Sequence, residues 1–348
     1  MKKWLIAVLC VVLCLMLAVG AVNFLVDPLM QYRPLHSALT FVAYDYDYIN
    51  PGVAKNSVYD GVLVGTSLAE NTDMDKCETY FGMPMIKLIY PGGTSRNNRE
   101  IMDVAFRGHD LKTVLWIIDD TLFSTESSAL SHELPMYLYD DFLPNDVRYL
   151  LNLSVLYNYT FKDVLNSLRG MSTPPLLRGI TWAASDKFGK DVVMALQNKD
   201  AAQVPDKGED FYQTHLTDNL ANNVFPLLEA HPDTQFYFFF PPKCITYWRN
   251  AQLSGVFEAK FYAMQYLVDA LLRYDNAHVY FFADRMEWST DLSIWKDNIH
   301  FKPLVNDQMC QEMAQGSEAL TAETAHPRIR ALHDTLKDAD YAQWLDDQ

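Results

Sequence analysis

The chain has 348 residues, of which 49% are hydrophobic and 21% are charged. This composition is typical of a folded globular protein and excludes a largely disordered one. The formal net charge of -16 argues against nucleic acid as a partner, because binding to phosphates requires a basic surface. The length allows one large domain or two smaller ones.

Residues 1–26 predict a transmembrane anchor. An almost unbroken apolar run from Trp4 to Val26 is about as long as a helix that crosses a bilayer. Lys2 and Lys3 precede this run, which predicts a single-pass protein with a cytoplasmic N-terminus and the remaining chain outside the cell membrane. A cleaved signal peptide, which would make the protein secreted, is the alternative, because small residues at 19–21 resemble a cleavage site.

Residues 27–58 are predicted to connect this anchor to the folded domain. Asp27 and Pro28 are expected to end the anchor helix. The aromatic residues at 41–48 suit either the membrane interface, where tyrosine is favourable, or packing on the domain.

Five short and nearly continuous apolar runs predict buried β-strands. They lie at residues 62–64, 85–90, 113–118, 235–240 and 278–282. Patterns typical of helices separate them, at residues 97–109, 211–231 and 252–274. This alternation predicts an α/β fold with a five-stranded, parallel, doubly wound sheet of the flavodoxin-like type, covered by helices on both faces.

Residues 121–210 predict a mostly helical insertion between the third and fourth strands, with helical stretches near 146–153 and 191–197. The insertion either forms a lid or substrate platform at the strand ends or lies far from the site. The domain is expected to cover residues 59–310, and residues 311–348 to form a C-terminal helix and tail.

The stretch Gly65-Thr66-Ser67 directly follows the first predicted strand. Gly65 allows a sharp turn there, and the carboxyl ends of strands in open α/β sheets face the crevice in which ligands bind. Ser67 is therefore a candidate nucleophile if a base can reach it. Taken alone, a serine at this place is more often a cap of the following helix.

Asp297 and His300 follow the last predicted strand and are separated by two residues. A turn of this length can place the carboxylate beside one imidazole nitrogen while the other nitrogen points at Ser67. A nucleophile, a base and an orienting acid in this order make a neutral hydroxyl reactive. A lone histidine near a strand end is usually structural, but its pairing with an aspartate favours a catalytic role.

These three residues, with a Gly92-Gly93 loop after the second strand, resemble the serine esterases and acyltransferases of the SGNH (GDSL-like) superfamily, over roughly residues 55–310. The resemblance implies Ser67 as nucleophile, His300 as general base and Asp297 as its orienting partner. It also implies an oxyanion hole built from the N–H groups of Ser67 and of the glycine loop, in which one donor is worth about 3 kcal/mol.

The N-terminal span narrows this resemblance. One span followed by such a domain is similar to the teichoic-acid D-alanyl transfer proteins and the alginate-type O-acetylation proteins. The Gly-Thr-Ser sequence also fits this membrane-anchored type better than the Gly-Asp-Ser of secreted lipases.

The chain departs from the family pattern after the third strand, where Asp119 and Asp120 replace Gly-x-Asn-Asp. An ionised aspartate cannot donate a hydrogen bond to an oxyanion, so the third donor is unassigned. Asn97 and Asn98 are candidate replacements. Asp119 and Asp120 either bind substrate hydroxyls or cap the segment that follows them.

Tyr247 and Trp248 follow the fourth strand, so they are expected to edge the same crevice. They are candidates for stacking on a sugar ring, although aromatic residues in such a loop more often pack inward.

The cysteines predict neither a disulfide framework nor a metal site, because they include no CxxC pair. Cys10 and Cys14 lie in the anchor, and Cys77, Cys244 and Cys310 are expected to be buried as small hydrophobic residues. An enzyme that uses Cys244 as nucleophile is a weak alternative, because no base lies near it in sequence. No cofactor is expected.

The leading hypothesis is serine-dependent acyl transfer or ester hydrolysis on a cell-envelope polysaccharide or polymer. The expected partners are this cell-surface glycan, the membrane and a multi-span membrane acyltransferase. The alternative is a non-catalytic SGNH-like protein that binds or assembles envelope components.

Overall fold

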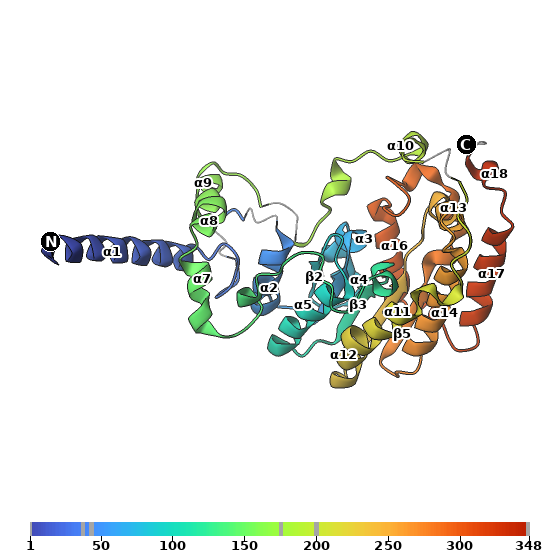
Figure 1. Ribbon diagram of the computed structural model, residues 1–348, viewed down its shortest axis with the longest axis horizontal. Coiled ribbons are helices and arrows are strands. Elements are labelled where there is room, and N and C mark those ends of the chain that lie inside the picture. The colour runs from blue at the N-terminus through green and yellow to red at the C-terminus, as the bar shows by residue number, and fades with distance from the viewer. Residues whose placement is uncertain (1, 36–38, 42–44, 174–176, 198–201, 346–348) are drawn as a thin grey trace. The chain divides into compact units, whose positions relative to one another are not determined.

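The computed structural model describes residues 2–35, 39–41, 45–173, 177–197 and 202–345 (Figure 1). The chain forms two compact units. The first comprises Met1–Val58, Glu100–His109 and His132–Leu177. The second comprises Tyr59–Arg99, Asp110–Ser131 and Arg178–Gln348. The predicted insertion is therefore not one piece, because its residues are shared between the two units.

The second unit is built on one parallel sheet with the strand order β2-β1-β3-β4-β5. Its strands are β1 (Gly61–Gly65), β2 (Met85–Ile89), β3 (Thr113–Ile117), β4 (Gln235–Phe240) and β5 (Ala277–Phe281). All residues of β1, β2 and β3 are buried, as expected for strands covered on both faces. The predicted doubly wound α/β fold is confirmed, and each strand lies within one residue of its predicted bounds.

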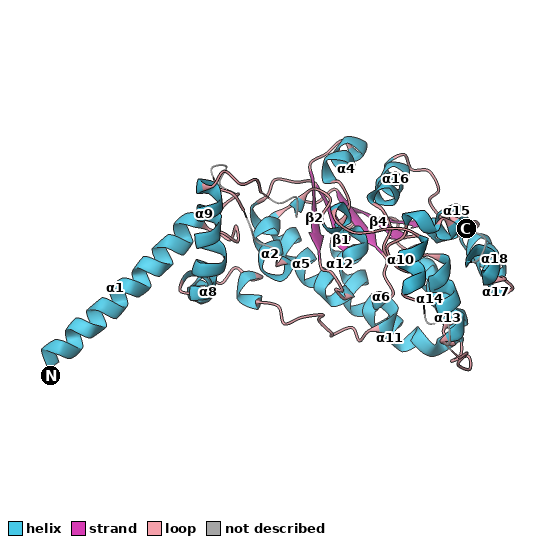
Figure 2. Cartoon of the chain, turned by 90° about the horizontal axis from the view of Figure 1, so that it is seen from above, coloured by secondary structure: helices cyan, strands magenta, loops and turns pink. Residues whose placement is uncertain are grey.

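Helices cover both faces of this sheet. When the chain is seen from above, α4 (Met74–Phe81) and α16 (Pro303–Ala314) lie on one side, and α12 (Phe225–Ala230) and α14 (Phe257–Leu271) lie on the other (Figure 2). The remaining helices of the unit are α3 (Ser67–Glu70), α6 (Thr121–Ser124), α10 (Lys190–Ala195), α11 (Gln213–Asn219), α13 (Ile245–Leu253), α15 (Met286–Thr290), α17 (Ala325–Lys337) and α18 (Tyr341–Leu345). The predicted domain end at residue 310 falls inside α16.

The helix expected at 252–274 is shorter than predicted. Gly255 separates α13 from α14 with a φ of 66°, and a Cβ atom there would lie 2.2 Å from the Pro205 carbonyl oxygen. Only glycine fits such a close approach of two backbones. Within the predicted helix at 211–231, a π-helical turn at Leu220–Val224 joins α11 to α12.

The first unit contains α1 (Lys2–Val26), α2 (Tyr46–Asn56), α7 (Val147–Leu150), α8 (Leu153–Val155) and α9 (Phe161–Leu168). Helix α5 (Ser95–Gly108) begins in the second unit and continues into the first. Helix α1 is long and apolar enough to cross a membrane, and a signal sequence has the same properties. It ends directly before Asp27 and Pro28, as predicted.

Candidate active site

The turn between β1 and α3 presents Ser67 at the carboxyl end of β1. Gly65 has a φ of 151°, and a Cβ atom on it would lie 2.2 Å from Ile117 Cγ2, so no larger residue fits. Thr66 caps α3 and donates a hydrogen bond of 2.6 Å to Asp119 Oδ2. Ser67 is therefore the first residue of α3 and not its cap, which leaves its hydroxyl available for chemistry.

A chain of hydrogen bonds joins Ser67, His300 and Asp297. The Ser67 Oγ atom lies 2.8 Å from His300 Nε2, and His300 Nδ1 lies 2.7 Å from Asp297 Oδ2. A carboxylate beside Nδ1 favours the tautomer that carries its proton on this nitrogen, so that Nε2 can accept the serine proton. The structure thus brings together the three residues that sequence analysis placed in one site.

A short loop holds Asp297 rigidly. Its Oδ1 atom accepts hydrogen bonds of 2.8 Å from the backbone N–H groups of Ile299 and His300. Burial raises the pKa of the Asp297 carboxyl, but the hydrogen bonds from His300 and from these N–H groups outweigh burial, and its pKa is lowered overall. The carboxylate therefore remains ionised and oriented toward the imidazole.

Trp182 packs against the imidazole of His300, with ring centroids 5.3 Å apart in an edge-to-face arrangement. Asn71, which ends α3, accepts hydrogen bonds from the N–H groups of Thr181 and Ala183 and so fixes the segment that carries Trp182. Part of the predicted insertion thus borders the candidate site. Sequence reasoning missed Trp182, because nothing in the local pattern ties it to a histidine over a hundred residues away.

Gly92 and Gly93 form the loop after β2 that is predicted to contribute N–H groups to an oxyanion hole. The N–H group of Gly93 donates to the Tyr90 carbonyl oxygen at 2.7 Å, so this donor is used within the turn. Gly92 has a φ of 67°, and no atom lies within 4 Å of the place where a Cβ atom would be. The prediction of Gly93 as an oxyanion donor is wrong, because its N–H group closes the turn of the loop. Ser67 and Gly92 are the predicted backbone donors for which no such bond is seen among the described residues.

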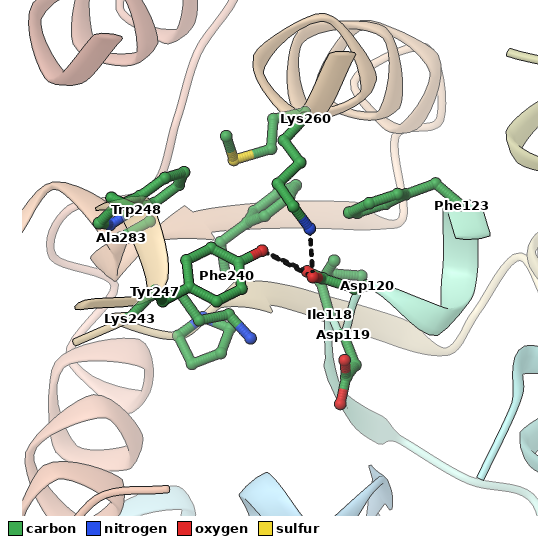
Figure 3. A pocket seen from close by; sticks show the side chains of 12 residues that line it. Ile118, Asp119, Asp120, Phe123, Phe240, Lys243, Tyr247, Trp248, Lys260 and Ala283 are labelled. Atoms are coloured by element: carbon green, nitrogen blue, oxygen red, sulfur yellow. Dashed lines mark hydrogen bonds and ion pairs between the residues drawn. The ribbon is translucent and has the colours of Figure 1, made fainter. Parts of the chain in front are cut away.

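Asp120 lies at the centre of a polar cluster, with the side chains of Tyr247 and Lys260 pointing toward its carboxylate (Figure 3). Its carboxylate accepts hydrogen bonds from Tyr247 Oη at 2.6 and 2.8 Å and pairs with Lys260 Nζ at 2.5 Å. Burial raises the pKa of Asp120, but the charges of Lys260 and Lys243 outweigh it and lower the pKa to about 2. Asp120 is thus fully occupied by protein partners, and it does not cap α6 with its side chain.

These residues line a small pocket that also includes Asp119 and several apolar side chains. Its cavity volume is about 20 Å³, which is room for about one water molecule and not for a sugar ring. Lys243 Nζ is buried there, lies 5.2 Å from the centre of the Tyr247 ring, and has no hydrogen-bond partner among the described residues. Lys243 and Lys260 had no predicted role.

Trp248 does not form a platform for a sugar ring. Its ring is only 1% exposed and stacks on Phe261 with centroids 5.2 Å apart. Tyr247 is 8% exposed, because its hydroxyl reaches inward to Asp120. The two residues lie in the first turn of α13 and not in an open loop, and they pack inward, which is the alternative considered from the sequence.

Asn97 and Asn98 are both buried. Asn97 Oδ1 accepts hydrogen bonds from the N–H groups of Thr94 and Ser131, so this side chain stabilises the loop before α5. The geometry thus gives Asn97 a structural role and does not assign a third oxyanion donor.

The cysteines of the second unit, Cys77, Cys244 and Cys310, are buried, as predicted. Burial raises the pKa of the Cys244 thiol to about 11, so it remains protonated and poorly nucleophilic at neutral pH. Among the residues that the structure describes, no three His, Cys, Asp or Glu side chains gather as metal ligands.

No model of a known protein family matches the sequence, and no match was found among curated proteins. The function of the chain is therefore inferred from the geometry of the site.

Proposed function

We propose that the chain is a membrane-anchored serine acyltransferase or esterase of the SGNH type, acting on a polysaccharide or polymer of the cell envelope. The observation that carries the proposal is the continuous hydrogen-bonded chain from Ser67 through His300 to Asp297. The sheet order, with Ser67 directly after β1 and the histidine loop after β5, supports it.

In this proposal, His300 Nε2 takes the hydroxyl proton while Ser67 Oγ attacks the carbonyl carbon of an ester. The N–H groups of Ser67 and Gly92 stabilise the negative oxygen that forms. The intermediate collapses by breaking the ester bond, and His300 returns the proton to the departing alcohol. A glycan hydroxyl or water then takes the acyl group from Ser67 by the same steps in reverse.

Helix α1 supports a membrane setting. Lys2 and Lys3 before the span favour a cytoplasmic N-terminus, which would place Ser67 outside the cell membrane near envelope polymers. A multi-span membrane acyltransferase is the partner class that fits, because activated acyl groups are made in the cytoplasm and must cross the membrane. A cleaved signal would instead release the same site into the medium.

Covalent labelling of the full-length protein in detergent with a fluorophosphonate tests the proposal. We expect stoichiometric labelling that is lost in Ser67→Ala and kept in Ser293→Ala, because Ser293 is exposed and serves as the matched control. Failure of the folded wild-type protein to react would favour the alternative, a non-catalytic protein that binds or assembles envelope components.

A further inference from the structure

Helices α8 and α9, joined by a π-helical turn at Leu156–Thr160, carry an exposed apolar face. It consists of Leu153, Tyr157, Phe161, Val164 and Leu168, whose exposed fractions run from 36% for Val164 to 81% for Leu168. The spacing of three and four residues puts them on one side of a helix, and the rings of Tyr157 and Phe161 are stacked 6.4 Å apart. We call this set the apolar face.

The opposite side of the same segment is firmly packed. Val155, Thr160 and Asp163 are each at most 2% exposed. The apolar face is therefore exposed on a helix whose opposite side is packed against the rest of the first unit. A continuous apolar stripe of this kind on a folded surface marks a contact with a partner or a membrane.

Hydrogen bonds made by the buried side chain of Asn23 attach this segment to the C-terminal end of α1. Asn23 Nδ2 donates to the Leu150 and Asn152 carbonyl oxygens, and Asn23 Oδ1 accepts from Thr160 Oγ1 at 2.8 Å. Tyr149 Oη donates to Asp27 Oδ1 at 2.9 Å, directly after the helix. In both views, α8 and α9 lie beside this end of α1 (Figures 1 and 2).

The length of α1 indicates where Asn23 would lie relative to the hydrocarbon core of a bilayer. A hydrocarbon core about 30 Å thick takes about 20 residues at a rise of about 1.5 Å per residue. Counted from Trp4, the span therefore ends close to Asn23. Tyr32 packs on Phe24 with ring centroids 5.1 Å apart, and Arg33 lies over the same ring, which are residue types that favour the membrane–water interface.

The charge of the segment also differs from that of the whole chain. Residues 147–170 contain Arg148, Lys162 and Arg169 but only one acidic residue, the buried Asp163, which gives a net charge of +2 (3 basic minus 1 acidic). The full chain has a net charge of -16. Cationic side chains beside an apolar helical face favour contact with anionic lipid headgroups.

We propose that the apolar face lies in the headgroup region of the bilayer that α1 crosses, so that α8 and α9 form an interfacial membrane-binding helix. The occupant is the lipid, because the face is rigidly joined to the spanning helix at the depth where the span leaves the hydrocarbon core. This inference does not depend on the proposed acyl-transfer chemistry.

Site-specific fluorescence of the full-length chain in vesicles of phosphatidylcholine and phosphatidylglycerol tests this proposal. Cys10→Ala and Cys14→Ala remove the accessible cysteines of α1, and the other three are buried. The environment-sensitive dye NBD is then attached at Phe161→Cys or Leu168→Cys. The matched control is Leu304→Cys, at an exposed leucine of α16 in the second unit.

We expect the dyes at Phe161 and Leu168 to emit at shorter wavelength than the dye at Leu304. They should be quenched by lipids with a nitroxide near the headgroup and be several-fold less accessible to aqueous iodide. Equal iodide access at all three positions would overturn the proposal. Protection from iodide without quenching by nitroxide lipids would overturn it too, because protein would then cover the face.

Discussion

At the scale of single residues, the proposed mechanism depends on His300 acting as a base that is oriented by Asp297. Its two oxygens are divided between the backbone of the loop and the imidazole, so that it holds both the orientation and the tautomer of the ring. Asparagine has nearly the same size but would present an amide group to Nδ1.

We therefore expect Asp297→Asn to lower kcat for hydrolysis of p-nitrophenyl acetate by about 10³- to 10⁴-fold, the size of effect known for the same change in serine proteases. The matched control is Asp186→Asn, which removes a carboxylate paired with Lys296 but does not contact His300. A loss of less than about tenfold in Asp297→Asn would show that this carboxylate does not orient a catalytic base.

Asp120 is paired with Lys260, and its lowered pKa predicts how the stability of the fold depends on pH. The folded-state pKa of about 2 lies below the ordinary value of 3.8, so ionised Asp120 stabilises the fold above about pH 4. This contribution, about 2 kcal/mol, is lost as the pH falls through about 2.

We expect Asp120→Asn to lower the free energy of unfolding by about 3 kcal/mol at neutral pH, because it leaves Lys260 buried without its partner. Urea unfolding from pH 7 to pH 2 should show this difference shrinking below about pH 4. The more exposed pair of Asp186 and Lys296 supplies the comparison, and Asp186→Asn should cost less than about 1 kcal/mol. A difference for Asp120→Asn that does not change with pH would contradict the account.

At the scale of elements, Lys87 ties together the segments around the Ser67 turn. This lysine of β2 is 1% exposed, and its Nζ atom donates to the carbonyl oxygens of Glu70 and Gly179 at 2.5 Å and of Thr72 at 3.2 Å. The side chain therefore joins the end of α3 to the segment that carries Trp182.

Burial lowers the pKa of Lys87 to about 8 from 10.5, so the folded protein binds this proton more weakly than the unfolded chain does. Between about pH 8 and 10.5, the free energy of unfolding of the wild type should rise by about 3 kcal/mol relative to Lys87→Met. Chemical unfolding of both proteins across this range measures the difference. The idea fails if the difference between the two proteins does not change over this range.

The strands could be predicted from the sequence because each is a continuous apolar run, and a strand buried on both faces needs little else. The bounds of the helices were harder to predict. Gly255 ends α13 because the Pro205 carbonyl lies against it, a contact between distant parts of the chain that leaves no local pattern.

The site residues that could be predicted from the sequence are those that follow strand ends. Ser67, Asp297 and His300 follow strand ends, and parallel strands end at one edge of a sheet, so topology alone brings them near each other. Trp182 and Lys260 lie in helical or irregular segments that reach the site by packing. The sequence predicts Gly93 as a donor, and the spacing of the glycines does not reveal that its N–H group closes a turn.

At the scale of the whole molecule, the helix that is long enough to span a membrane and the candidate site belong to different units of the chain. The first unit holds α1, the connector and the segment with the apolar face, and the second holds the sheet and the candidate site. The predicted insertion of 121–210 is divided between the two units. Residues 132–177 belong to the unit of the anchor, and the residues on either side of them, including Trp182, belong to the unit of the sheet.

The proposed function requires Ser67 to carry an acyl group during turnover. This is tested by mass spectrometry of the full-length protein, quenched in acid soon after mixing with p-nitrophenyl acetate. We expect a protein heavier by one acetyl group, with the modification on the peptide that contains Ser67 and absent in both Ser67→Ala and His300→Ala. Release of nitrophenol without an acetylated Ser67, or equal acetylation in His300→Ala, would contradict it.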